Sequence, residues 1–261
     1  MPTPTIEVST HIEAPVETVF SFFADPARFV QWFEHGSLIE PGPGGRVEIR
    51  SPMGPPATGP IEAWEPNRRI AFLFGHPPGS GMLPPASSTV TVTFTEERGG
   101  TRVSIRHSGI ADEPMRRGAG GGWQAALGRL AGACWRHRLG DRLPRLLAAW
   151  TKAWQEPDRD GRRALLVECF EERGSLRDMF ARIDGREALV DWIGGVQQMM
   201  PGLRMEPTGA AQAVQGHLSW PWRVVAPDGS VVGTGHQYAE LGRDLLITST
   251  IGFWSAPPGA A

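Results

Sequence analysis

The sequence predicts an α+β protein of two consecutive domains, each with a curved antiparallel sheet packed against helices. Its first half reads as helices, strands and then one long helix, whereas its second half reads as helices followed only by strands. With 261 residues, of which 40% are hydrophobic and 21% charged, the chain can form two ordinary domains that each bury a core. We place the boundary within residues 140–144, which gives domains of residues 1–142 and 143–261. An apolar cavity between sheet and helices is expected in each domain.

The first domain begins with a half-buried strand, because Ile6, Val8 and Ile12 alternate with polar residues. Pro15 suits the first turn of a following helix, where its missing N–H is not needed. Strand-like runs follow at residues 46–50, 58–64, 69–74, 89–95 and 102–107. A closing helix is predicted from apolar residues at helical spacing, namely Trp123, Ala126, Leu127, Leu130, Cys134 and His137.

Several motifs of this half occur in an order typical of one superfamily. They are Phe20 to Trp32, Gly44-Gly45-Arg46, Gly59 to Trp64, Pro66 to Ile70, Gly100 to Val103, His107-Ser108-Gly109 and Gly122-Trp123. Residues 4–140 resemble the START-like (SRPBCC) superfamily, within it the branch related to activators of the heat-shock-protein-90 ATPase. The resemblance implies a helix-grip fold with a hydrophobic ligand cavity and no single activity.

Four residues of the first domain are candidates for lining such a cavity: Trp32, Phe72, His107 and Trp123. His107 shares one strand face with Val103 and Ile105, so it points with the core. Its alternative role is structural, as a buried histidine bonded to its neighbours. The aromatic residues are likewise either cavity walls or plain core.

The second domain begins with helices and ends in strands. Helices are predicted from Pro144, around residues 164–170, and from Gly185 to about Met200. Strands are predicted at residues 203–208, 213–225, 231–241 and 245–254, and residues 176–180 are expected to form a loop.

Motifs of this half also follow a familiar order. They are Trp150-x3-Trp154, Leu176-x-Asp178, Gly185-Arg186-Glu187, Pro201-Gly202-Leu203, Trp220-x-Trp222, Asp228-Gly229, Gly235-x-x-Tyr238-x-Glu240 and Ile251-Gly252-Phe253. Residues 145–255 resemble nuclear transport factor 2-like proteins, in particular the SnoaL-like polyketide cyclases. The resemblance implies an α+β cone in which enzymes of the family transfer protons inside a dry cavity.

Polar candidates for such chemistry lie mainly on one predicted strand. His236, Tyr238 and Glu240 alternate and therefore share a face. Many relatives have Asp where His236 stands, so His236 has either taken over proton transfer or marks a degenerate site. We predict His236 as the base, Asp178 as its orienting partner and Tyr238 as a donor to an enolate oxygen, with Glu240 near the ligand. The alternatives are that this face is solvated and that Asp178 caps a turn.

Tryptophans are the candidate walls of the second cavity: Trp154, Trp192, Trp220 and Trp222. His217 is a further candidate ligand-binding residue. Pro221 leaves the phase of its strand, and so the direction of His217, open.

Other classes of function have no support in the sequence. A net charge of −2 argues against nucleic-acid binding, and no metal-binding or nucleotide-binding motif is found, so we expect no cofactor and no metal. No apolar run is long enough to span a membrane and residues 1–5 do not read as a signal peptide, so we expect a cytoplasmic protein. A homodimer is suggested by the second resemblance alone.

The predicted function is that of a cofactor-independent enzyme of specialised, polyketide-like metabolism. It would act on a hydrophobic small molecule by general acid–base chemistry, in a cyclisation, dehydration or isomerisation. One alternative is a noncatalytic carrier or self-resistance protein for a hydrophobic ligand, and another is an interaction protein.

Overall fold

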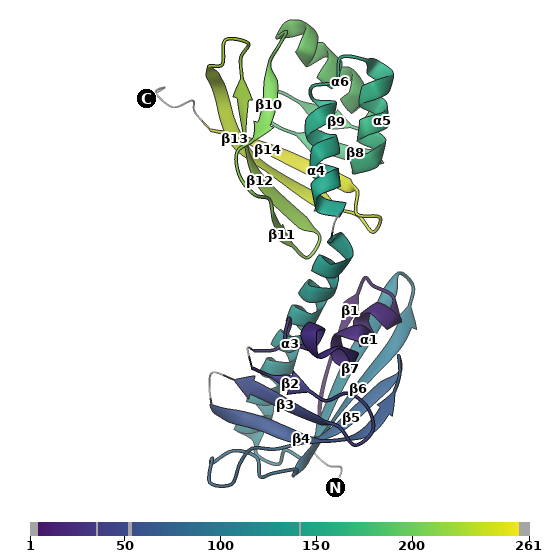
Figure 1. The fold of residues 1–261 in the computed structure, drawn as a ribbon, viewed down its shortest axis with the longest axis vertical. Helices are drawn as coiled ribbons and strands as arrows, with labels where there is room; N and C mark the ends of the chain where they lie inside the picture. The colour runs from purple at the N-terminus through teal and green to yellow at the C-terminus, as the bar shows by residue number, and fades with distance from the viewer. Residues whose placement is uncertain (1–4, 35, 52–53, 141, 256–261) are drawn as a thin grey trace. The chain divides into compact units, whose positions relative to one another are not determined.

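The computed structural model describes residues 5–34, 36–51, 54–140 and 142–255. Contacts between Cα atoms divide the chain into two compact units, Met1–Arg138 and Leu139–Ala261, which we call the N-terminal and C-terminal units (Figure 1). The predicted domain boundary at 142/143 remains a prediction. Among the described residues, no helix combines the length and the apolar character needed to cross a bilayer.

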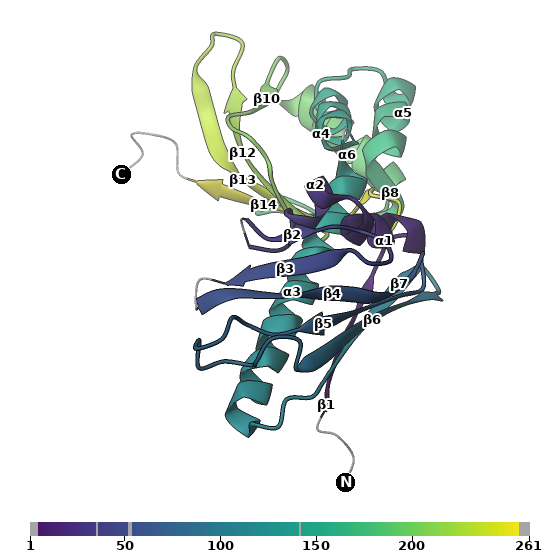
Figure 2. The same ribbon diagram turned by 60° about the horizontal axis from the view of Figure 1, so that its bottom comes forward.

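The N-terminal unit is a seven-stranded antiparallel sheet with helices on one face (Figure 2). Its elements are β1 (Thr5–Ile12), α1 (Val16–Ala24), α2 (Pro26–Phe29), β2 (Leu38–Ile39), β3 (Arg46–Ser51), β4 (Gly54–Glu65), β5 (Arg69–Phe74), β6 (Ser88–Glu97), β7 (Gly100–Ser108) and α3 (Glu113–Leu139). The strand order is β1-β7-β6-β5-β4-β3-β2. This architecture confirms the predicted helix-grip fold.

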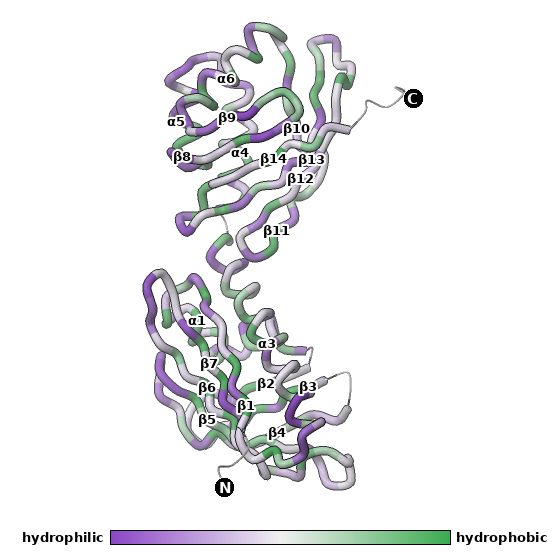
Figure 3. The backbone as a smooth tube through the Cα atoms, turned by 180° about the vertical axis from the view of Figure 1, so that it is seen from behind, coloured by the Kyte–Doolittle hydropathy of each residue, from purple (hydrophilic) through white to green (hydrophobic). Residues whose placement is uncertain are grey.

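The long helix α3 packs its apolar stripe into the core of this unit. Trp123, Leu127, Leu130 and Cys134 are buried against residues of α1 and the sheet. Green and purple segments alternate along α3 in Figure 3, as expected for a helix with one buried face. The helix begins earlier than its stripe predicts, because Oδ1 of Asp112 accepts a hydrogen bond from Met115 N at 2.7 Å and caps the helix there.

The C-terminal unit is a curved mixed sheet covered on one face by three helices (Figure 1). Its elements are α4 (Arg142–Ala153), α5 (Arg159–Cys169), β8 (Phe170–Arg177), β9 (Arg182–Asp184), α6 (Arg186–Met199), β10 (Arg204–Pro207), β11 (Gln212–Val214), β12 (His217–Val225), β13 (Val231–Leu241) and β14 (Ile247–Ser255). The strand order is β10-β12-β13-β14-β8-β9, with β11 beside β12. Three helices packed on a curved sheet confirm the predicted cone, although β8 and β9 precede the third helix in the chain.

Two segments differ from the sequence-based expectation. The predicted single strand 213–225 is a tight hairpin, because Gln215 and Gly216 both have positive φ and form its turn. The predicted loop at 176–180 overlaps β8, which pairs in parallel with β14. Within the described residues, this is the one parallel strand pair of an otherwise antiparallel sheet. Because the partner of β8 is distant in the sequence, no turn next to β8 marks it as a strand.

Candidate functional site

The interior of the N-terminal unit is filled by side chains. The residual space beside Trp32, Phe72 and Trp123 measures about 10 Å³, which is at most the room of one water molecule. Trp32 donates its indole N–H to the carbonyl of Phe22 at 3.0 Å, and its ring packs against Phe23 and Phe29. The prediction that Trp32, Phe72, His107 and Trp123 line a ligand cavity is therefore wrong in this structure, because aromatic packing closes it.

His107 takes the structural role that was left open. It is fully buried; its Nδ1 accepts from Trp123 Nε1 at 3.0 Å and its Nε2 lies 2.9 Å from Ser88 Oγ. Since Ser88 Oγ donates to the carbonyl oxygen of Phe74, the ring must carry its proton on Nε2. Burial lowers the pKa of His107 from 6.5 to about 4, so the ring is neutral at physiological pH.

We expect acid to weaken the N-terminal unit through His107. The unfolded histidine takes up a proton as the pH falls below 6.5, whereas the folded one does so only near a pKa of about 4. Stability is thus fully present above pH 6.5 and declines towards pH 4, by about 2 kcal/mol between about pH 7.5 and about pH 5. Urea unfolding of wild type and His107→Gln measures this: the variant should be less stable near neutrality but lose less on acidification. Equal pH slopes would contradict the assignment.

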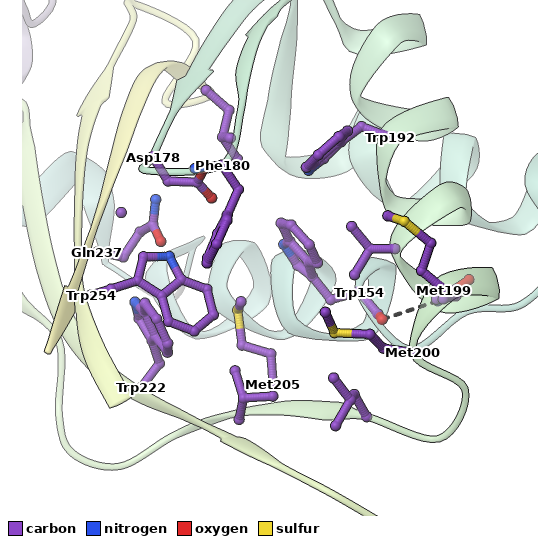
Figure 4. Close-up of a pocket in the computed structure, with 16 residues that line it drawn as sticks. Trp154, Asp178, Phe180, Trp192, Met199, Met200, Met205, Trp222, Gln237 and Trp254 are labelled. Carbon is purple, nitrogen blue, oxygen red and sulfur yellow. Dashed lines mark hydrogen bonds between the residues drawn. The ribbon is translucent and has the colours of Figure 1, made fainter. Parts of the chain in front are cut away.

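The C-terminal unit contains a cavity of about 320 Å³ between α6, the β8–β9 turn and the sheet (Figure 4). Five aromatic side chains line it: Trp154, Phe180, Trp192, Trp222 and Trp254. Apolar chains complete the wall, including Met199, Met200, Leu203 and Met205. This volume lies within the range of small-molecule sites.

Small residues on β13 create the space for the aromatic wall. A Cβ atom on Gly235 would lie 2.4 Å from Cζ2 of Trp222, and one on Gly233 would lie 2.7 Å from Cζ3 of Trp254. The two indoles therefore lie directly over the bare backbone of the strand. They contact each other edge to face, with ring centroids 4.7 Å apart.

The predicted row His236, Tyr238 and Glu240 does not reach this cavity. In the β12–β13 ladder, Trp220 is opposite Gln237 and Trp222 is opposite Gly235. Opposite residues share a face, so Gln237 points inwards and the three predicted residues point outwards, where all are exposed. The placement of His236 as an internal base and of Tyr238 and Glu240 beside the ligand is therefore corrected.

The remaining predicted residues divide between cavity, core and surface. Trp154, Trp192 and Trp222 line the cavity as expected. Trp220 instead packs edge to face on Trp150 in the core, with ring centroids 6.4 Å apart. His217 is exposed, because β12 stays regular through Pro221 and His217 keeps the phase opposite to the tryptophans.

Asp178 combines both roles considered for it. Its Oδ1 accepts hydrogen bonds from the backbone N–H groups of Phe180 and Ala181, at 2.8 and 2.7 Å, and so holds the β8–β9 turn. The same half-buried side chain lines the cavity, where it is the only ionisable group among the described lining residues. It cannot orient His236, which lies on the other face of the sheet.

Gln237 and the aromatics Phe180 and Trp254 were not predicted as site residues. The amide of Gln237 is 4% exposed and donates through Nε2 to Thr250 Oγ1 at 2.6 Å, and Thr250 in turn donates to the carbonyl oxygen of Tyr238 at 2.9 Å. Gln237 alternates with His236 and Tyr238 along β13, and only its pairing opposite Trp220 shows that it faces inwards. The indole Nε1 atoms of Trp154 and Trp222 are buried without a hydrogen-bond acceptor among the described residues.

The outer face of β13 and β14 carries exposed apolar groups. Tyr238 and Phe253 contact each other there, with ring centroids 5.5 Å apart, and Ile251 is exposed beside them. The suggested homodimer stays a prediction.

The comparisons with known structures each cover about half of this chain. A putative isomerase of the SnoaL-like family from Agrobacterium tumefaciens is 23% identical, with a TM-score of 0.43, over 45% of this chain and 100% of its own. CalU16 from Micromonospora echinospora is 26% identical, with a TM-score of 0.42, over 53% of this chain and 83% of its own. The comparison with curated proteins gives no match.

A family model matches the N-terminal part of the chain. Residues 13–134 match the family model described as Activator of Hsp90 ATPase homolog 1-like protein. An AHSA1-like protein from Rhizobium etli is 31% identical, with a TM-score of 0.43, over 51% of this chain and 82% of its own. Within the N-terminal unit, residues 13–134 are therefore similar to the Activator of Hsp90 ATPase homolog 1-like family.

Proposed function

We propose that the C-terminal unit binds a hydrophobic small molecule in the cavity of about 320 Å³. The observation that supports this most directly is the aromatic wall over Gly233 and Gly235, since two indoles are held apart from the opposite wall instead of packing against it. An apolar guest that filled this space would gain about 25 cal/mol for each Å² of apolar surface removed from water.

The entrance of the cavity supports the same proposal. Met199 and Met200 at the end of α6 and Phe180 in the β8–β9 turn line the cavity, yet they are 66%, 54% and 62% exposed. Unbranched methionine side chains adapt to irregular apolar shapes. A guest that covered these three side chains would remove apolar surface that the protein alone leaves in water.

The buried indole N–H groups add a polar requirement. Trp154 and Trp222 each keep an Nε1 donor without an acceptor among the described residues, and such a donor costs free energy until it is paired. An oxygen atom on the guest would satisfy one of them. The favoured guest is therefore a mainly apolar molecule that carries at least one hydrogen-bond acceptor.

Blocking the cavity should abolish this binding. Val196 on α6 lines the cavity, so Val196→Trp is expected to fill it and to weaken binding of the neutral probe N-phenyl-1-naphthylamine more than about tenfold. Titration of the full chain, followed by energy transfer from tryptophan to the probe, measures the affinity. The matched control is Val167→Trp on the exposed side of α5, which should bind as wild type does. Equal binding by both variants would contradict the proposal.

Acid–base catalysis is the second candidate function, favoured by the single carboxylate of Asp178 within apolar walls. In this proposal Asp178 alone transfers the proton in a cyclisation, dehydration or isomerisation. Native mass spectrometry of the purified protein separates the two candidates. A co-purified molecule that is recovered unchanged after incubation supports a carrier, and a converted one supports an enzyme.

A further inference from the structure

Among the described residues, no cation pairs with the carboxylate of Asp178. The arginine next to it in the chain, Arg177, pairs with Asp184 and donates to the carbonyls of Leu176 and Ile183 instead. Within the described residues no ion pair to Asp178 is present, and the hydrogen bonds to its carboxylate are accepted by Oδ1. Its other oxygen is left to face solvent or a guest.

A second acceptor lies at the same end of the cavity. An added Cβ on Gly252 would lie 3.4 Å from Cβ of Asp178 and 3.4 Å from Oε1 of Gln237, so this glycine leaves both side chains beside one open space. The bond from Gln237 Nε2 to Thr250 fixes the amide, which directs Oε1 towards the glycine. Figure 4 shows Asp178 and Gln237 together beside Phe180 and Trp254.

Aromatic faces surround this pair of acceptors. Trp254 contacts Trp222 at 4.7 Å and Phe180 at 5.2 Å between ring centroids, and Trp154 and Trp192 line the remaining wall. The face of an aromatic ring carries negative electrostatic potential and attracts cations, most strongly for tryptophan. Carboxylate, amide oxygen and indole faces all favour a positive charge, and none of them favours an anion.

Arg162, the one buried arginine among the described residues of this unit, does not oppose such a charge at that end. Arg162 does not line the cavity, and it donates hydrogen bonds to the carbonyls of Glu156, Pro157 and Val190 and to Oε1 of Gln197. Gln197 therefore stands between the guanidinium and the cavity.

We propose that the guest is a hydrophobic organic cation, an aryl or alkyl ammonium compound, whose charged nitrogen lies between Asp178, Gln237 and the aromatic rings. This inference rests on the proposed function, because it names the chemical class of the molecule in the same cavity. The apolar part of the guest occupies the space towards Met199 and Met205, and an ether or carbonyl oxygen on it would meet a free indole N–H.

Two probes of equal shape test the charge. Benzyltrimethylammonium and neopentylbenzene differ only in a positively charged nitrogen that replaces a neutral carbon. Titration of the full chain, followed by intrinsic tryptophan fluorescence, should give a dissociation constant at least about tenfold lower for the cation. Equal or tighter binding of neopentylbenzene overturns the proposal that the guest is a cation and leaves the proposed function intact. If neither probe binds, the proposal of a cationic guest is also overturned. The proposed function is then tested only by the titration with N-phenyl-1-naphthylamine.

Asp178→Asn tests the carboxylate. Asparagine keeps an oxygen that accepts from Phe180 and Ala181, so the turn is preserved while the charge is removed. The preference for the cation should fall to within about twofold, with neopentylbenzene binding unchanged. The matched control is Asp244→Asn, an exposed carboxylate between β13 and β14, which should keep the full preference. An unchanged preference in Asp178→Asn overturns the proposal.

Discussion

Replacement of Gly235 by alanine is expected to destabilise the C-terminal unit by about 3 kcal/mol and to abolish binding of N-phenyl-1-naphthylamine. The added Cβ would lie 2.2 Å from the carbonyl oxygen of Phe253 and 2.4 Å from Cζ2 of Trp222. The Phe253 oxygen belongs to the adjacent strand β14 and cannot yield without disturbing the ladder. The indole of Trp222 must therefore leave its place over β13, and the space into which it can move is the cavity.

Urea unfolding of the full chain and titration with the probe measure the two effects of Gly235→Ala. The matched control is Gly195→Ala on α6, where an added Cβ meets nothing within 4 Å. Alanine there should raise the free energy of unfolding by about 0.5–1 kcal/mol, since it favours a helix over glycine. A loss of stability in both variants, or wild-type binding by Gly235→Ala, would show that the glycine does not hold the wall open.

Helices and strands whose apolar residues repeat at a regular spacing could be predicted from the sequence. The stripe Trp123, Leu127 and Leu130 predicted α3 because each residue is buried by the same face of one helix. The parallel strand β8 could not be predicted in this way. Its partner β14 lies about 75 residues further along the chain, so no turn or alternation near Phe170 marks it.

The candidate site was half predictable for a related reason. Trp154, Trp192 and Trp222 were expected to form a wall, because large apolar side chains are buried and the interior of a cone is where they can be buried. The prediction for strand β13 was wrong, because its inner face carries glycines and its outer face carries His236 and Tyr238. Alternation separates the two faces without saying which is buried. The wall residue Trp222 opposite Gly235 decides it, and that pairing is tertiary information.

Arg162 is the residue of the site region that sequence reasoning missed most completely, although a signal exists. It occupies the buried stripe of α5 together with Leu166 and Cys169, at a position where an apolar residue is expected. Gly194 in the interior of α6 marks its counterpart, because a Cβ there would lie 2.5 Å from Nη2 of Arg162. A glycine inside one helix and an arginine in the buried stripe of another together indicate a close approach.

Arg162→Met is expected to lower the free energy of unfolding by about 4 kcal/mol and to weaken probe binding as well. Arg162 is 6% exposed, and its guanidinium donates to three backbone carbonyls and to Oε1 of Gln197. Methionine fills similar space but cannot donate to any of these four acceptors. Gln197 donates in turn to the carbonyl of Trp154 at 3.0 Å, so the arginine fixes two lining residues at once. Urea unfolding and probe titration measure both losses.

Arg163→Met is the matched control, because it removes only an exposed ion pair with Glu187. It should lower the free energy of unfolding by no more than about 1 kcal/mol and leave probe binding intact. Equal losses of stability and of probe affinity in the two variants would mean that the buried hydrogen bonds of Arg162 stabilise the protein no more than an exposed ion pair does.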